Sequence, residues 1–154
     1  MRTAALIALL LTLRTETFWA SQYAPGVMER VVEYRIRNHS LPDSTVEPVG
    51  YIAVIDCAEI GNVWWLRPAD SSLLFMPFQV ADCSGHAATT AWMQRNNIQV
   101  ELEYKWAVAF GTVGHGLLME RCYGTYCNLY RGRHTYPNAH QVVEPHSRWT
   151  HIAD

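Results

Sequence analysis

The sequence predicts a mainly β fold: a closed barrel that carries a few short helices. Apolar segments rich in Val, Ile, Trp and Tyr recur along the chain between turn residues, which is the pattern of short strands. Segments with helical character are few and brief. A sheet of many short strands avoids exposed edges by closing on itself, which favours a barrel. The 154 residues are enough for one domain with its own core.

The first part of the chain contains two predicted strands. Residues 17–23, rich in aromatic and hydroxyl side chains, form the first strand, which ends at a Pro-Gly turn. Residues 27–37 mix branched apolar side chains with Glu and Arg, and this pattern fits either a short helix or another strand. Residues 38–49 contain two prolines and are predicted as a surface loop. Residues 50–55 then form a buried strand.

The rest of the chain mixes strands with short helices. The predicted strands are 63–67, 73–81, 98–102 and 117–122, and the predicted helices are 89–96 and 104–110. The first two of these strands form a hairpin, because Pro68 and a polar tip separate them. Gly111 ends the second helix.

The N-terminus resembles a secretory leader. Its positive start and the apolar run at 4–13 have the length of a signal peptide and are too short to span a bilayer. The predicted organisation is a signal peptide at 1–16, a barrel domain at 17–123 and a peripheral tail at 124–154. A buried N-terminal strand or helix is the alternative, because residues 15–20 contain no small-x-small cleavage site. The expected location is outside the cytoplasm, with no stable membrane insertion after the leader is removed.

Charge and histidine spacing exclude several classes of function. The formal net charge of −2 provides no basic surface for nucleic acid. Four of the seven histidines lie in the tail, at spacings of five or six residues that match no zinc motif: His134, His140, His146 and His151. The sequence therefore predicts no metal, no cofactor and no nucleic-acid partner. It leaves the oligomeric state open.

Four cysteines, an even number, fit an oxidising compartment and two disulfides, with three possible connectivities. Cys122 and Cys127 flank a turn-like Tyr-Gly-Thr-Tyr insert and are the expected local pair. That leaves Cys57 with Cys83, each preceded by Asp. The alternative is four free thiols packed as small apolar side chains.

Two carboxylates at strand ends are candidate catalytic residues. Asp82 ends an apolar strand, and Glu101 lies on the predicted strand 98–102. Two acids on a rigid β scaffold are what general acid and base chemistry on a sugar chain requires. Partial burial is expected to keep Asp82 protonated, so that it can donate a proton to a glycosidic oxygen. The alternatives are an Asp82 that caps the following turn and a Glu101 that faces solvent.

Tryptophan is abundant, with six residues in the chain. Trp64 and Trp65 are adjacent on one strand, so they point to opposite faces of the sheet. One is expected in the core and the other on the surface, where an indole stacks on sugar rings, which makes both candidate substrate-binding residues. Trp92 and Trp106 lie in predicted helices and are expected in the core.

Four motifs occur in the order found in the family of rare lipoprotein A and the bacterial expansins. Residues 20–23 (Ala-Ser-Gln-Tyr) resemble the family's opening Ala-Ser/Thr-x-Tyr, and residues 58–63 resemble its Leu-Pro-Phe-Gly-Thr-x-Val turn. Residues 80–85 resemble Val-x-Asp-Arg-Gly-Pro. Residues 101–111 keep the spacing from an acid through Leu and a short helix to Gly, with Glu101 where the family has Asp. The resemblance covers roughly residues 17–122.

The resemblance implies a six-stranded double-psi β-barrel with short peripheral helices. It also implies Asp82 as the acid, Glu101 as its electrostatic partner, and Ser21 and Tyr23 as groove residues. The implied ligand is a cell-wall polysaccharide, most simply peptidoglycan. The family's lytic transglycosylases carry a His shortly before the second motif, where this chain has Ile55, Asp56 and Cys57.

Three functions remain open at the level of sequence. The first is a cleavage of wall glycan like that of a lytic transglycosylase, in which the sugar's own hydroxyl attacks the anomeric carbon. The second is an expansin-like module that grips the glycan without cutting it. The third is a scaffold barrel in a phage or cell-surface assembly, because a fold does not determine a function.

Overall fold

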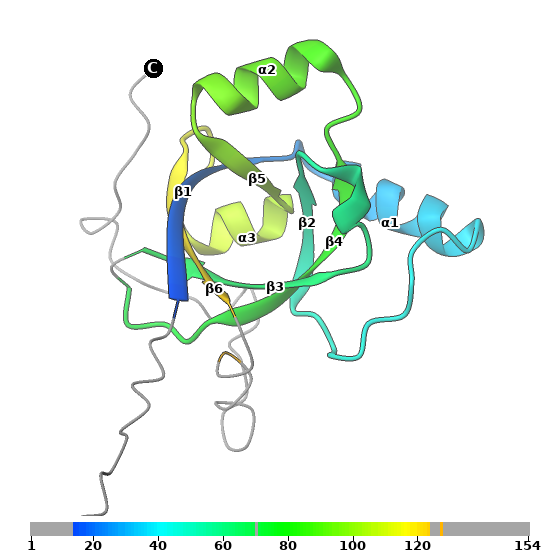
Figure 1. Ribbon diagram of the computed structural model, residues 1–154, viewed down its shortest axis with the longest axis horizontal. Helices are drawn as coiled ribbons and strands as arrows, with labels where there is room; N and C mark the ends of the chain where they lie inside the picture. Colours follow the sequence, from blue (N-terminus) through cyan, green and yellow to red (C-terminus); the bar gives the residue numbers. More distant parts are fainter. Residues whose placement is uncertain (1–13, 70, 124–126, 128–154) are drawn as a thin grey trace, which may run out of the picture.

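The computed structural model describes residues 14–69, 71–123 and 127. Within these residues the chain forms six strands, three α-helices and one short 3-10 helix, in agreement with the predicted mainly β class (Figure 1). The strands are β1 (Arg14–Gln22), β2 (Gly50–Val54), β3 (Val63–Pro68), β4 (Met76–Cys83), β5 (Ile98–Leu102) and β6 (Leu117–Tyr123). The helices are α1 (Val27–Arg37), η1 (Cys57–Glu59), α2 (Ala87–Arg95) and α3 (Tyr104–Ala109).

The six strands form one closed sheet. Their order is β1-β5-β2-β4-β3-β6, and β6 pairs with β1 to complete the ring. Two pairs are parallel, β1 with β5 and β2 with β4, while the other four pairs are antiparallel. Exchanging β1 with β4, β2 with β5 and β3 with β6 gives the same six strand pairs, with the same directions. The two halves of the chain therefore have the same strand topology.

Each strand contributes every second residue to the core, because successive side chains of a strand point to opposite faces. The buried residues of the strands inside the barrel are Phe18, Ala20, Ile52, Val54, Trp64, Leu66, Met76, Phe78, Val80, Val100, Leu102, Leu117 and Met119. These positions carry the apolar side chains that made the strands recognisable in the sequence. The alternating partners face the helices or solvent.

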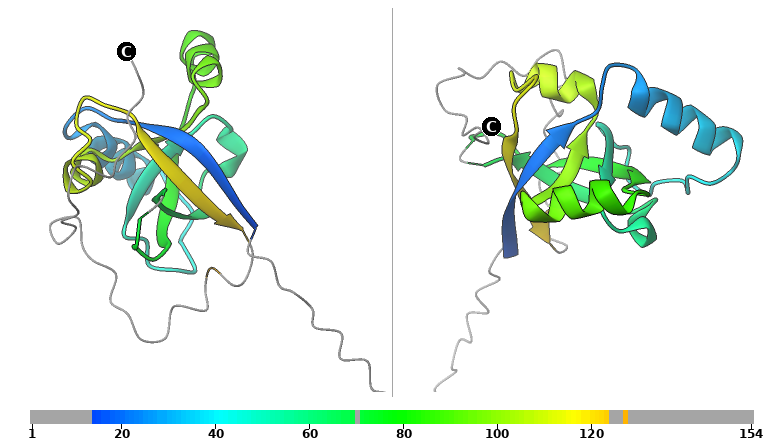
Figure 2. Two further views of the ribbon diagram at one scale, coloured as in Figure 1. Left: turned by 90° about the vertical axis from the view of Figure 1, so that its left-hand side faces the viewer. Right: turned by 90° about the horizontal axis from the view of Figure 1, so that it is seen from above.

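Helix α3 and the residue that follows it each supply an aromatic side chain to the same core. Trp106 and Phe110 are fully buried, and Trp106 makes an edge-on contact with Phe78 of β4 at 5.2 Å between ring centroids. In Figure 1 the helix lies within the ring of strands, and the turned view of Figure 2 (left) places it to one side. The Trp106 indole also donates a hydrogen bond to the carbonyl of Val49 (3.2 Å). The predicted core position of Trp106 is confirmed.

The segment after the first strand is a helix rather than a strand. Helix α1 begins after Gly26, which has φ +72°, and buries Met28 and Val32 at a spacing of four residues. That spacing places both side chains on one helical face, which packs on β4 and β2. Helix α2 packs on β5 and buries Met93.

Several element boundaries differ from the predicted ones. Strand β1 begins at Arg14, so residues 14–16, which the sequence assigned to the leader, pair with β6. Strand β4 begins at Met76 instead of 73 and continues to Cys83. Helix η1 was not predicted, because its three residues are too few for a periodic pattern. The rest of the predicted leader (1–13) and nearly all of the tail lie outside the described residues.

Both expected disulfides are present. Cys57 of η1 pairs with Cys83 at the end of β4, with 4.9 Å between the Cα atoms. Cys122 pairs with Cys127 and packs with Trp65 and Phe75 in a small apolar cluster. No cysteine of the chain is free. The Cys57–Cys83 bond fastens η1 next to the strand end that carries Asp82.

Candidate functional site

The strand register places the two candidate acids on one sheet face, on either side of Ala53. Ala53 of β2 is opposite Asp82 of β4 and opposite Glu101 of β5, and Glu101 is opposite Ser21 of β1. Residues opposite one another on adjacent strands project from the same face. We call these four residues, Asp82, Ala53, Glu101 and Ser21, the acid row. The small side chain of Ala53 separates the two carboxylates.

Asp82 is held by an arginine and a tyrosine. Arg35 of α1 forms an ion pair with its Oδ1 at 2.9 Å, and the Tyr23 hydroxyl donates to its Oδ2 at 2.8 Å. The pKa of Tyr23 is raised, mainly by burial and then by its hydrogen bond to Asp82, so the phenol stays neutral and remains a donor. An ion pair with a guanidinium uses the ionised form of the carboxylate. The contact therefore places a fixed positive charge against the carboxylate that was expected to act as the acid.

The carboxyl group of Glu101 is largely buried and lies near the charge of Asp82. Burial raises the pKa of its carboxyl group above the ordinary value of 4.5, and the charge of Asp82 raises it further. The Ser21 hydroxyl donates to Glu101 Oε1 at 3.3 Å, which opposes part of that rise. Of the two acids, Glu101 is thus the one whose pKa is raised, and Asp82 is the one that forms the ion pair with Arg35.

The raised pKa of Glu101 predicts a pH dependence of stability. Between the ordinary pKa of 4.5 and the raised value, the folded protein holds a proton that the unfolded chain has released. The stabilising contribution is therefore complete below 4.5 and is lost as the pH rises through the folded pKa. We expect the free energy of unfolding of the wild type, relative to Glu101→Gln, to fall over this range. Urea unfolding of both proteins from about pH 4 to 8 measures the difference, and a constant difference across that range contradicts the assignment.

Arg35 is the site residue that the sequence did not identify. It lies three residues after Val32 on the buried face of α1 and reaches Asp82 from there. An arginine on the buried face of an amphipathic helix signals a carboxylate partner, because a buried cation is costly unless it is paired. That signal is present in the sequence at positions 28, 32 and 35. The sequence does not indicate which acid is the partner.

Two expected tryptophan positions are not observed: neither Trp64 nor Trp65 lies on the surface, and Trp92 does not lie in the core. Trp64 packs in the barrel core and Trp65 packs with the Cys122–Cys127 disulfide, so they do point to opposite faces. However, they are only 6% and 7% exposed, and neither forms an open surface for stacking. Arg121 also lies over the Trp64 ring, 3.4 Å from its centroid. Trp92, expected in the core, is 43% exposed.

Two hollows border the acid row. One, of about 330 Å³, lies beside Asp82 and is lined by residues of α1: Val27, Arg30, Val31, Tyr34 and Arg35. The other, of about 300 Å³, contains Ser21 and is lined by residues of β1, α2, the turn after α2, β5 and the loop before β6: Gln22, Trp92, Asn96, Ile98, Gly114, His115 and Gly116. Seen from above in Figure 2 (right), α1 and α2 are separate helices on different sides of the strands. The row therefore has a hollow next to each of its end residues.

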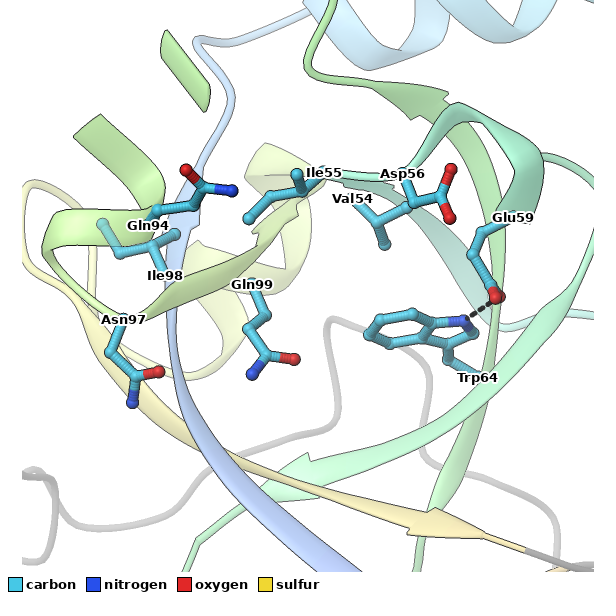
Figure 3. A pocket seen from close by; sticks show the side chains of 9 residues that line it. All are labelled: Val54, Ile55, Asp56, Glu59, Trp64, Gln94, Asn97, Ile98 and Gln99. Carbon is cyan, nitrogen blue, oxygen red and sulfur yellow. Dashed lines mark hydrogen bonds between the residues drawn. The ribbon is translucent and has the colours of Figure 1, made fainter. Parts of the chain in front are cut away.

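A third hollow, of about 370 Å³, contains none of the row residues. Its side chains come from β2, η1, β3, α2 and β5 and surround a common space (Figure 3): Val54, Ile55, Asp56, Glu59, Trp64, Gln94, Asn97, Ile98 and Gln99. The Trp64 indole donates to Glu59 Oε2 at 2.9 Å, and Asn62 donates to the same oxygen. These two bonds lower the pKa of Glu59, with a smaller contribution from the charge of Arg121.

Other features of the described residues bear on membranes and metals. No helix in the part of the chain that the structure describes is long and apolar enough to cross a membrane. The four tail histidines weighed as metal ligands lie outside those residues.

Comparisons of the chain with protein-family models, with curated proteins and with solved structures found no match. The residues themselves therefore carry the assignment of function.

Proposed function

We propose that this protein binds a cell-wall polysaccharide, most simply peptidoglycan, across the acid row. The observation that carries the proposal is the position of two hydrogen-bonded pairs, Ser21 with Glu101 and Tyr23 with Asp82, on either side of Ala53. These four residues come from three strand ends and are the ones that the family resemblance implied. Carboxylate, hydroxyl and guanidinium groups in a partly exposed row are suited to hydrogen-bond sugar hydroxyls.

The double-psi architecture is part of this proposal. A double-psi barrel consists of two interlocked units of three strands each. Such units require two parallel strand pairs that are equivalent when the two halves of the chain are exchanged, and the pairs β1·β5 and β2·β4 have this relation. The helical connections follow the same exchange, since α1 joins β1 to β2 and α2 joins β4 to β5. This internal repeat of topology supports the family resemblance independently of the four sequence motifs.

An extracytoplasmic location also belongs to the proposal. Two disulfides involve all four cysteines, and such bonds persist in oxidising compartments. A wall-binding protein has to be exported, so the cysteine chemistry and the proposed ligand point to the same compartment.

Cleavage of the glycan is the second candidate function, and the raised pKa of Glu101 favours it. A protonated Glu101 can donate to the glycosidic oxygen, and the ionised Asp82 can stabilise the positive charge that develops on the sugar ring. The sugar's own hydroxyl then attacks the anomeric carbon and gives its proton to the Glu101 carboxylate, which has just protonated the leaving oxygen. Binding alone is the first candidate, because the Arg35 guanidinium that pairs with Asp82 offsets the negative charge that cleavage would use to stabilise the sugar cation.

Incubation of the purified protein with insoluble peptidoglycan tests both candidates. We expect the wild type to sediment with the glycan, and Asp82→Asn and Glu101→Gln to sediment less. If the protein cleaves, mass spectrometry detects soluble fragments, and Glu101→Gln lowers their rate of release by roughly a hundredfold or more. Glu33→Gln, at an exposed position on α1, is the matched control and should behave as the wild type. A wild type that stays in the supernatant contradicts the proposed function.

A further inference from the structure

Trp92 is exposed to an unusual degree for its type. It is 43% exposed, whereas Trp64, Trp65 and Trp106 are at most 7% exposed. Burial of an indole is strongly favourable, and on α2 only Met93 is buried. The helix thus packs on β5 through a neighbouring residue and leaves the indole at the surface. Such a ring is available for a ligand with an apolar face.

The surroundings of Trp92 combine this aromatic ring with polar groups. The hollow of about 300 Å³ beside it includes Gln22, Asn96 and His115. Gly114 and Gly116 line the same hollow, and a Cβ added at Gly114 would meet no atom within 4 Å. The side-chain oxygen of Gln22 accepts a hydrogen bond from the Gly114 amide at 3.3 Å, which links the loop before β6 to β1. An open aromatic ring edged by amide and imidazole groups suits a ligand that is apolar on one face and hydroxylated at its edge.

The hollow is continuous with the acid row through Ser21. The Ser21 side chain donates to Glu101, and the same residue lines the hollow with Trp92. A chain-like ligand that contacts Glu101 can therefore extend past Ser21 onto the indole without leaving the surface. The ligand class that fits is a pyranose polymer, because its rings present a C–H face for stacking and hydroxyls at their edges.

We propose that Trp92 forms a stacking subsite for a pyranose ring of the bound glycan, on the β1 and α2 side of Glu101. This inference rests on the proposed function and adds to it the direction in which the glycan leaves the acid row. It also assigns a role to α2, which carries the ring, and to the glycine-containing loop before β6, which leaves the hollow open.

The test measures binding of soluble peptidoglycan glycan fragments and sedimentation with insoluble peptidoglycan. We expect Trp92→Ala to weaken binding by about 10- to 30-fold, the effect of removing an aromatic contact residue. Trp92→Phe should restore most of the affinity, because the ring face is retained. Val108→Ala removes an exposed apolar side chain from α3 and should leave binding unchanged. Thermal unfolding of each variant verifies that it is folded, as expected for a change at an exposed position.

The outcomes separate this subsite from the function on which it rests. A wild type that binds no glycan overturns both. A wild type that binds and is weakened by Asp82→Asn, while Trp92→Ala binds equally well, overturns the subsite and leaves the function in place. Loss of affinity in Trp92→Phe equal to that in Trp92→Ala also overturns it, because stacking would then not explain the loss.

Discussion

Replacing Gly50 with alanine is expected to lower the free energy of unfolding by about 3 kcal/mol, the upper part of the range for overpacked cores. A Cβ at Gly50 would lie 2.3 Å from Nε1 of Trp106, 2.7 Å from its Cδ1 and 3.0 Å from Oε2 of Glu103. The indole cannot move aside easily, since it packs between Phe78 and Phe110 and donates to the Val49 carbonyl. Urea unfolding of the purified variant measures the loss.

Two further variants isolate the cause of this loss. Gly85→Ala is the matched control, because no atom lies within 4 Å of its added Cβ, and it should change stability by less than about 1 kcal/mol. In a Trp106→Leu background, Gly50→Ala should cost clearly less than in the wild type, since the colliding atoms are gone. An equal cost in both backgrounds would show that Trp106 is not the reason for glycine at this position.

Removal of the Cys57–Cys83 disulfide is the second large expected effect. The two cysteines are separated by 26 positions in the sequence, and the chain-entropy model gives a loss of roughly 3.5 kcal/mol for a loop of that size. We expect Cys57→Ala/Cys83→Ala to lower the free energy of unfolding by this amount, as measured by urea unfolding. Ala58→Ser, at an exposed position next to Cys57, serves as the control and should leave the unfolding curve unchanged.

The same double variant reports on the acid row. Cys83 directly follows Asp82, and Val54, opposite Cys83, directly follows Ala53. Loss of the bond frees η1 from the end of β4 and should therefore weaken glycan binding as well as stability. If the variant unfolds with the wild type, the bond does not stabilise the folded state, and no effect on the acid row is then expected.

The strands were predictable because their signal is local. Alternation of apolar residues, as in Ile52 and Val54 or Leu117 and Met119, reflects burial of one strand face and needs no knowledge of the partner strand. Helix α1 was ambiguous because branched apolar residues suit both structures, and the packing of Met28 and Val32 on the sheet decided for the helix. The disulfides were predictable from the close spacing of Cys122 and Cys127, which left one other pair.

The roles of individual side chains were less predictable. Trp92 was expected in the core and one of Trp64 and Trp65 on the surface, yet Trp64 and Trp65 are buried and Trp92 is exposed. Burial of an aromatic residue depends on what the rest of the chain places over it. For Trp64 that cover includes Arg121, which lies 57 positions later in the sequence. A short helix such as α2, with a single buried residue, has no apolar stripe to predict its orientation.

The sequence by itself determined the mainly β class, most of the strands, the cysteine pairs and the two acids that stand at strand ends. Only the tertiary structure decided that Ala53 aligns Asp82 with Glu101, that Arg35 pairs with Asp82, and that Glu101 is the acid with the raised pKa. The reason is that protonation depends on burial and on neighbouring charges. Those neighbours are brought together by the closure of the barrel, from segments that are distant in the chain.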